Sequence, residues 1–148
     1  MLQRTVPRPT WMQKWPGMFV LNGSQTHWTR EMEELFLQEG GLGPHTMLER
    51  QRAQLADMTK LVRGKLSPSA RVTIGALTVI DVHARDVIIR LVDEGVTEAD
   101  HFSWMSQLRY YWVDGNLQAQ MVAATRPYGY EYLGKYARKC QGRKINFS

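Results

Sequence analysis

The densest group of ionisable side chains in the sequence is the run DVHARD, from Asp81 to Asp86. On a helix, His83 and Asp86 are three positions apart and could meet on one face, and a carboxylate beside a histidine is half of an acid–base pair. The sequence places no nucleophile and no third group next to them. A structural hydrogen bond within a helical bundle is therefore the favoured interpretation, and we predict no catalytic residue.

A second pair of residues, Gly64 and Lys65, resembles the end of a phosphate-binding loop. Such a loop requires another glycine five positions before this one and a serine or threonine directly after the lysine. Those positions hold Thr59 and Leu66, and the pair lies at the end of an expected helix instead of after a strand. We therefore predict no nucleotide site and no bound cofactor.

Side chains that could bind a metal are scattered along the chain. The histidines other than His83 are His27, His45 and His101. None has a metal-ligand spacing, and Cys140, the single cysteine, cannot form an internal disulfide, which is typical of a reducing intracellular compartment. The apolar run from Met18 to Leu21 is too short for a signal peptide, and no stretch approaches a membrane span. The sequence predicts a cytoplasmic protein with no metal and no membrane partner.

The net charge of +5 raises the question of a nucleic-acid partner. Five basic residues follow Gly134 with no acidic residue among them: Lys135, Arg138, Lys139, Arg143 and Lys144. The remaining chain holds 14 basic and 14 acidic residues, so the positive surface expected of a nucleic-acid-binding protein is confined to a short tail. We predict no nucleic-acid partner and a disordered basic tail over residues 135–148.

Hydrophobic spacing predicts four helices, at about 16–38, 44–66, 68–95 and 97–113. Ser67 and Pro68 supply an N-cap and a first-turn proline for the third helix. Asp100 forms an approximate capping box with Thr97 for the fourth, while Asn22-Gly23 is the weak point of the first. Residues 1–15 are expected to form an extended lead-in.

The helix spacing also predicts which side chains are buried. Along the four helices in order, they are Met18, Leu21, Gln25, Trp28, Met32, Leu35, Phe36; Met47, Leu48, Gln51, Leu55, Met58, Val62, Leu66; Ile74, Leu77, Ile80, Ala84, Val87, Ile88, Leu91; Trp104, Met105, Leu108, Tyr111 and Trp112.

After a turn at Asp114-Gly115-Asn116, the pattern changes to the two-residue period of strands, from Leu117 to Ala123 and again at Tyr128, Tyr130 and Tyr132. Alternating tyrosines could stack on nucleic-acid bases, but packing at the edge of a sheet is the commoner use and the one we favour. The predicted fold class is mainly α, with a bundle of about four helices, then a short β hairpin or strand pair and the basic tail.

Four stretches of the sequence carry a family resemblance. They are WPGMFVLNGSQTHWT (15–29), LVRGKLSPSARVTIGALTVIDVHARDVI (61–88), FSWMSQLRYYW (102–112) and GYEYLG (129–134). In this order and spacing they resemble axonemal dynein heavy chains, over about Trp11 to Gly134. Beyond Gly134 the family continues into an adenine-contacting segment and a phosphate-binding loop, whereas this sequence departs from that pattern.

The resemblance implies a division of the chain into an extended lead-in (1–15), the C-terminal helical part of the dynein linker (16–113), a β segment leading into the first ATPase module (114–134) and a divergent basic tail (135–148). It implies a truncated, non-catalytic fragment of a motor that drives ciliary, microtubule-based movement by an ATP-dependent swing of the linker. The implied partners are the remainder of the motor and other dynein chains, in the cytoskeleton and the axoneme of the cilium.

A second hypothesis is a stand-alone helical interaction module whose basic tail binds an acidic partner. The two hypotheses differ in the surface that they predict. A piece of a larger assembly should expose a large apolar patch where its neighbours would pack, whereas an independent module should not.

Overall fold

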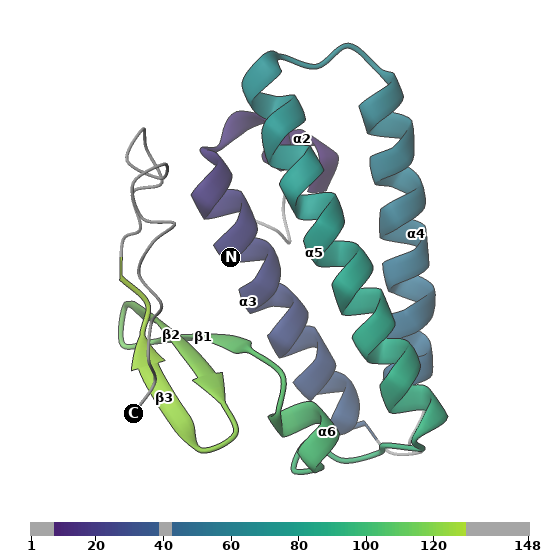
Figure 1. Ribbon diagram of the computed structural model, residues 1–148, viewed down its shortest axis with the longest axis vertical. Helices are drawn as coiled ribbons and strands as arrows, with labels where there is room; N and C mark the ends of the chain where they lie inside the picture. The colour runs from purple at the N-terminus through teal and green to yellow at the C-terminus, as the bar shows by residue number, and fades with distance from the viewer. Residues whose placement is uncertain (1–7, 39–42, 130–148) are drawn as a thin grey trace, which may run out of the picture.

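The computed structural model describes residues 8–38 and 43–129. Its elements in chain order are α2 (Arg8–Lys14), α3 (Gly17–Phe36), α4 (Gly43–Arg63), α5 (Pro68–Asp93), α6 (Phe102–Met105), β1 (Arg109–Val113), β2 (Asn116–Met121) and β3 (Ala124–Pro127). Three long helices, α3, α4 and α5, run side by side along the long axis, and the sheet lies beside α3 (Figure 1). The predicted class, a mainly helical body followed by strands, is confirmed, with a three-stranded sheet in place of the expected pair.

The longest helix, α5, begins where its local signals predict. Ser67 is the N-cap, and its hydroxyl accepts a hydrogen bond of 3.2 Å from the backbone N–H of Ala70, while Pro68 occupies the first turn. Its predicted apolar face is buried except for Ile80, which is half-buried. This helix therefore forms the centre of the bundle, with α4 packed along it.

The core consists of two hydrophobic clusters at opposite ends of the long helices. One cluster joins α3, α4, α5 and α6 through Met32, Leu35, Met47, Leu48, Val87, Ile88, Leu91, Val96 and Trp104. The other joins α2, α3, α4 and α5 through Trp11, Met12, Val20, Met58, Ile74 and Leu77. Burying each large apolar side chain contributes about 1.5–3 kcal/mol, so both ends of the bundle are held by packing.

The expectation of an extended lead-in over residues 1–15 is wrong for Arg8–Lys14, which form α2. Proline is compatible with the first turn of a helix, where the backbone N–H has no partner in the helix, so Pro9 does not prevent this helix. The helix buries Trp11 and Met12 against the bundle. Residues 1–7 lie outside the described residues.

The suspected break at Asn22-Gly23 does not occur, because α3 runs through it without interruption. The indole of Trp11 packs over this point, and a Cβ on Gly23 would lie 3.4 Å from its ring. This is an ordinary van der Waals distance, so the contact with Trp11 does not depend on the absence of a side chain at Gly23. The second predicted helix is also confirmed as α4, although it ends at Arg63, slightly before the expected Leu66.

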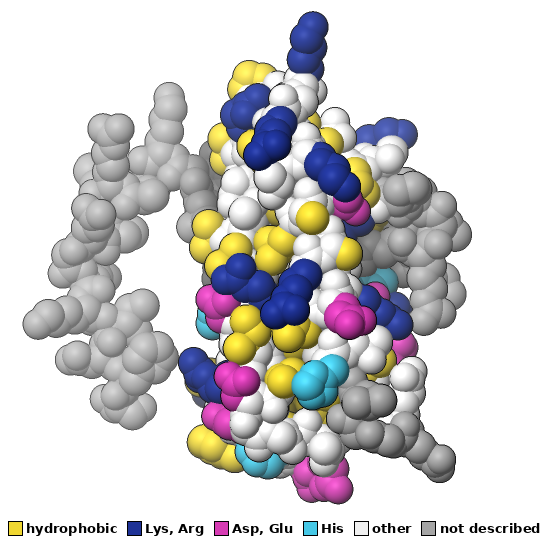
Figure 2. Space-filling view, turned by 90° about the vertical axis from the view of Figure 1, so that its right-hand side faces the viewer, with side chains coloured by type: hydrophobic (Ala, Val, Ile, Leu, Met, Phe, Trp, Pro, Cys, Tyr) yellow, Lys and Arg dark blue, Asp and Glu magenta, His cyan; other side chains and the backbone are white. Residues whose placement is uncertain are grey.

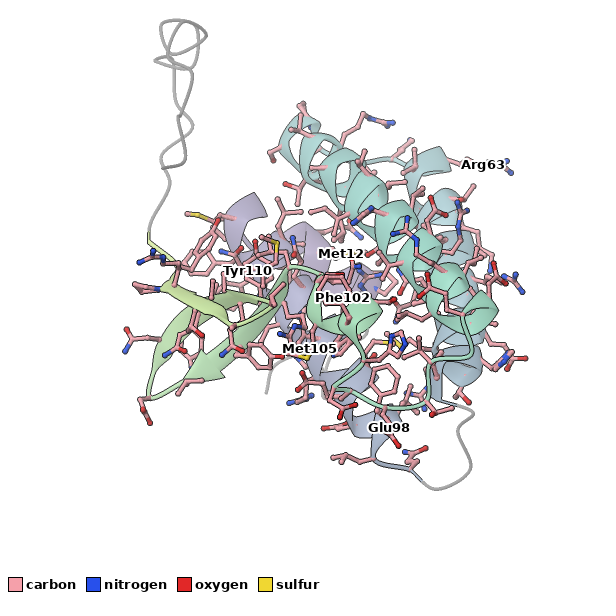
Figure 3. All side chains as sticks on the ribbon, turned by 60° about the horizontal axis from the view of Figure 1, so that its bottom comes forward. Met12, Arg63, Glu98, Phe102, Met105 and Tyr110 are labelled. Carbon is pink, nitrogen blue, oxygen red and sulfur yellow. The ribbon has the colours of Figure 1, made fainter. Side chains whose placement is uncertain are left out.

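The fourth predicted helix, 97–113, is wrong over most of its length. Only the single turn α6 is helical, with His101 as its N-cap in place of the Thr97–Asp100 capping box, and Arg109–Val113 form β1. As a result, Trp104 is fully buried as predicted, but Leu108 and Trp112 are exposed. Figure 3 shows this region, with Phe102 and Met105 on α6 and Tyr110 at the start of the sheet.

The sheet is antiparallel with the strand order β1-β2-β3. Asp114 and Gly115, with φ of 50° and 76°, form the two-residue connection between β1 and β2, which requires positive φ at both positions. The ring of Tyr128, after β3, packs edge-on against Tyr110 with 5.8 Å between centroids, so this tyrosine is used for packing. Tyr130, Tyr132 and the basic tail over 135–148 lie outside the described residues.

Candidate functional site: the junction between helix and sheet

The structure shows no hydrogen bond between His83 and Asp86, the contact that their helical spacing suggested. Both side chains are exposed on α5, and the Asp86 carboxylate accepts hydrogen bonds of 2.7 and 3.0 Å from the guanidinium of its neighbour Arg85. Gly64 follows the last turn of α4, as expected for a helix end. Residues 8–38 and 43–129 contain no group of three or more potential metal ligands, and no helix among them is long and apolar enough to cross a membrane.

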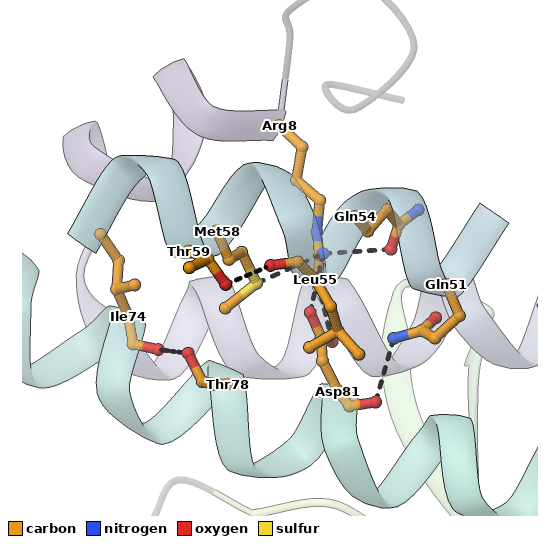
Figure 4. A network of polar contacts seen from close by, with 9 residues as sticks. All are labelled: Arg8, Gln51, Gln54, Leu55, Met58, Thr59, Ile74, Thr78 and Asp81. Atoms are coloured by element: carbon orange, nitrogen blue, oxygen red, sulfur yellow. Dashed lines mark hydrogen bonds and ion pairs between the residues drawn. The ribbon is translucent and has the colours of Figure 1, made fainter. Parts of the chain in front are cut away.

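The member of the DVHARD run that makes the long-range contacts is Asp81 (Figure 4). Its carboxylate, 6% exposed, accepts hydrogen bonds of 2.8 and 2.9 Å from the two terminal nitrogens of Arg8 on α2. Gln54 accepts a third bond from Arg8, and the Gln51 amide donates to the backbone carbonyl of Asp81. A carboxylate on the apolar stripe between Leu77 and Ala84 is the sequence signal for this buried ion pair, although the spacing alone does not identify Arg8 as its partner.

A second polar network joins α3 to β1. The Tyr111 hydroxyl on β1 donates a short hydrogen bond to the carboxylate of Glu33 on α3. The Arg109 guanidinium donates to the Tyr111 hydroxyl at 3.0 Å and lies 3.7 Å from Glu33 as an ion pair. Because Arg109 is buried, this charge is neutralised within the junction instead of by solvent.

The Tyr111 phenol remains a hydrogen-bond donor well into the alkaline range. Its burial raises its pKa above the ordinary value of a tyrosine, and the hydrogen bond to Glu33 and the negative charge of that carboxylate raise it further. The positive charge of Arg109 acts in the opposite direction and is outweighed. The arrangement therefore keeps the phenol proton in its hydrogen bond to Glu33.

The backbone of β1 is also bonded to α3. The backbone N–H of Tyr110 donates to the Thr29 hydroxyl at 3.1 Å, in a buried contact between positions 81 apart in the sequence. Thr29 and Glu33 lie one helical turn apart and face the sheet together. These contacts, with the Arg109 and Tyr111 side chains, form a rigid connection between the helical body and the sheet, which we call the α3–β1 junction.

An open groove of about 810 Å³ continues beyond the junction, between α3 and the sheet. We call it the α3–β1 groove. One wall is a stripe along α3, from Met18 to Glu33, and the other includes the consecutive strand residues Tyr110 to Val113. Phe19 and Trp112, both exposed, belong to opposite walls. The lining is mixed: apolar side chains such as Met18, Phe19 and Trp112 stand beside polar ones such as Asn22 and Thr26.

The sequence matches axonemal dynein heavy chains along most of its length. It is 46% identical over 133 residues to mouse dynein axonemal heavy chain 3, and 45% identical over 134 residues to human dynein axonemal heavy chain 1; both matches cover 90% of this chain. It is 44% identical over 131 residues, 88% of its length, to rat dynein axonemal heavy chain 12. No family model matches the sequence. The chain belongs with the axonemal dynein heavy chains.

This dynein sequence spans a very small part of its relatives. The matched stretch is 3% of dynein axonemal heavy chains 3 and 1, and 4% of dynein axonemal heavy chain 12. The identity therefore establishes the kind of protein, while the activity of a complete heavy chain is not transferred to so short a stretch.

The surface of the dynein chain carries several large apolar side chains. The most exposed are Phe19, Leu37, Val72, Val79, Phe102 and Trp112. Figure 2 shows the face on the side of α4, where hydrophobic side chains stand among Lys, Arg, Asp and Glu. These residues lie on several different elements, and exposed apolar side chains scattered in this way are normal on a protein surface, so they do not distinguish the two hypotheses.

Proposed function

We propose that this chain acts as a mechanical coupling segment of a dynein heavy chain, namely the C-terminal helical part of the linker (16–113) followed by the β segment that leads into the first ATPase module (114–134). The boundary between them falls at the Asp114-Gly115 turn, between two strands of one sheet. The sheet therefore contains strands from both parts, and a displacement of one part moves the other.

The observation that supports this role is the α3–β1 junction. A 20-residue helix and the first strand are joined by Thr29, Glu33, Arg109 and Tyr111 through buried or half-buried polar contacts, not by a flexible connection. Because packed elements joined by several contacts shift as rigid bodies, such a junction would transmit force between a helix and a sheet. Its location would be the axoneme of a cilium, with the remainder of the motor and other dynein chains as partners.

The proposed role is non-catalytic. The charged groups described in the network of Arg8 and at the junction are paired with one another, and His83 and Asp86 are separate on the surface. Titration calorimetry of the purified chain with magnesium-ATP is expected to give only the heat of dilution. Saturable binding that a second nucleotide competes away would contradict a non-catalytic role.

The mechanical part of the proposal is tested in a full-length axonemal dynein heavy chain that contains this stretch. Glu33→Gln and Tyr111→Phe weaken the junction without altering any group of the ATPase modules, so ATP hydrolysis is expected to persist while microtubule gliding slows. The matched control is Glu49→Gln, at an exposed position on α4. Unchanged gliding in the junction variants would overturn the proposal.

A further inference from the structure

We propose that a small polar cavity inside the helical bundle binds an ordered water molecule, which accepts a hydrogen bond from the indole N–H of Trp28 and pairs with the hydroxyl of Ser24. This inference goes beyond the mechanical role, because it concerns the interior of the bundle and holds whether or not the chain acts as a lever. It rests on the size of the cavity, on two buried polar atoms that line it and on the charges of its walls.

The cavity has a volume of about 40 Å³ and is lined by residues of α2, α3, α4 and α5. Its wall on α3 includes Ser24 and Trp28, and its other walls include Arg8, Gln51 and Asp81 from the network shown in Figure 4. Each lining residue is buried or half-buried. A buried water needs roughly 10–15 Å³ of cavity volume and occupies about 30 Å³ in the liquid, so this volume suits water and excludes a nucleotide or a peptide.

Two polar atoms in the lining, Ser24 Oγ and Trp28 Nε1, are buried and make no hydrogen bond with any residue that the structure describes. Ser24 is only 6% exposed. The two residues are four positions apart on α3, so their side chains are neighbours on one face of the helix. Because a buried polar atom without a partner is destabilising, most such atoms bond either to protein or to ordered water.

The Ser24 hydroxyl does not use the partner that hydroxyls on the long helices otherwise use. Thr26, Thr59 and Thr78, on α3, α4 and α5, each donate to the backbone carbonyl four residues earlier, at 2.8, 2.9 and 2.7 Å. Ser24 makes no such bond to the carbonyl of Val20. Its hydroxyl is therefore available to a molecule in the cavity, both as a donor and as an acceptor.

The charges of the walls favour a neutral molecule that both donates and accepts hydrogen bonds. The indole N–H of Trp28 can only donate, which disfavours a cation, whereas the carboxylates of Glu31 and Asp81 disfavour an anion. A water oxygen accepts from Trp28, and its hydrogens have acceptors in the Ser24 hydroxyl and the Asp81 carboxylate. An ionised carboxylate accepts about four hydrogen bonds, and Arg8 supplies two of them.

A water in this position also extends the polar network of the bundle. Arg8 and Asp81 join α2 to α5, and the Gln51 amide joins α4 to the backbone carbonyl of Asp81. Ser24 and Trp28, on α3, make no direct side-chain hydrogen bond to this network through the two buried atoms. The water therefore brings α3 into the network, which then reaches all four helices that line the cavity.

The first measurement is a rotating-frame Overhauser NMR experiment on the full chain with isotopically labelled indole nitrogens, and water itself is the probe. A dipolar contact with a long-lived water has the opposite sign to chemical exchange, so the two are distinguished. We expect a contact at the indole N–H of Trp28, assigned with Trp28→Phe, and none at that of Trp104. The Trp104 nitrogen is the matched control, because it is also buried without a partner but does not line the cavity.

No dipolar contact at Trp28 would overturn the proposal. A contact of equal strength at Trp104 would also overturn it, because water would then reach buried indoles without this cavity. Both outcomes come from the unaltered chain, so they do not depend on the folding of any variant.

Substitution at position 24 tests the pairing with the hydroxyl. Ser24→Val places methyl groups where the hydroxyl stands, so it should displace the water and abolish the contact at Trp28. Thr26→Val is the matched control on the same helix, because Thr26 does not line this cavity, and the contact should persist. Circular dichroism verifies the fold of both variants. An unchanged contact in folded Ser24→Val would overturn the assignment of Ser24, and if that variant does not fold, the comparison of the two indoles still decides.

Salt titrations separate water from a small ion as the occupant. Ammonium chloride and sodium phosphate are added to the full chain, with sodium chloride as the control for ionic strength, and the indole signal of Trp28 is followed. We expect no saturable shift with any of the three salts. A saturable shift with ammonium or phosphate that sodium chloride does not reproduce would show that the cavity takes an ion, and would overturn water as its ligand.

Discussion

Arg8 and Asp81 lie 73 positions apart and are joined by two hydrogen bonds, of 2.8 and 2.9 Å, in which each terminal nitrogen of the guanidinium binds one carboxylate oxygen. Such two-point pairing fixes direction as well as distance. Because Arg8 is the first residue of α2 and Asp81 lies at the middle of α5, this pair fixes the orientation of α2 across the bundle.

We expect Arg8→Met to destabilise the chain by about 3 kcal/mol in urea unfolding, because it leaves the Asp81 carboxylate buried without a partner. The value is at the lower end of the range for buried pairs, since Arg8 keeps some contact with solvent. Lys60→Met, which breaks an exposed pair with Asp57, should change stability by less than about 1 kcal/mol. Similar losses in the two variants would contradict a special role for the Arg8 pair.

The centre of α5 should be sensitive to the loss of apolar volume. Leu77 is fully buried, so Leu77→Ala is expected to cost about 2–5 kcal/mol, whereas Arg90→Ala at an exposed position of the same helix should cost about 0–1 kcal/mol. His83→Ala should behave like Arg90→Ala, because His83 is also exposed. Equal, small effects at Leu77 and Arg90 in urea unfolding would mean that α5 does not form the core of the isolated chain.

Replacing either of two tryptophans eight positions apart should have very different effects on stability. Trp104 is fully buried, with its ring 5.2 Å from Trp28 and 5.7 Å from Phe36, so Trp104→Ala is expected to cost about 3–5 kcal/mol. Trp112 is 67% exposed, so Trp112→Ala should leave the melting temperature nearly unchanged. Thermal unfolding followed by circular dichroism measures both changes, and a large loss at Trp112 would argue for the helix that the sequence predicted.

The raised pKa of Tyr111 makes stability depend on alkaline pH. The unfolded chain loses the phenol proton near pH 10, while the folded chain keeps it to higher pH, so the stabilisation by the Tyr111–Glu33 contact is complete below about pH 10 and declines above it. Tyr111→Phe should remove this part of the decline. Urea unfolding of both proteins across this range gives the difference directly, and parallel curves would show that Tyr111 titrates alike in both states.

The sequence alone predicts those helices whose ends and buried faces are determined by neighbouring residues. Ser67 and Pro68 predict the start of α5, and the spacing from Ile74 to Leu91 predicts its buried face, because capping and helical periodicity depend on nearby residues alone. The sequence does not predict the strand at Arg109–Val113, because the apolar residues there fit the face of a helix as well as a strand. The choice depends on Thr29 and Glu33, which lie far away in the sequence and bond to the strand.

The candidate site was predicted less well than the fold. The sequence drew attention to His83 and Asp86, which are close in sequence, whereas the interactions that join elements involve Arg8 with Asp81 and Glu33 with Tyr111. Local spacing can indicate pairs within one helix, but a pair between elements requires the packing to be known. The buried acid on the apolar face of α5 was the one signal available beforehand.

The contact between Thr29 and Tyr110 also determines how the molecule should open in solution. Neighbouring helices α4 and α5 are connected through residues 64–67, but the sheet is attached to α3 by a bond that spans 81 positions, and every residue of β3 is exposed. Regions with few buried contacts open at low free energy, whereas core helices open only with the whole domain. Amide hydrogen exchange should therefore be fastest in β3, slower at the N–H of Tyr110 and slowest in the centre of α5.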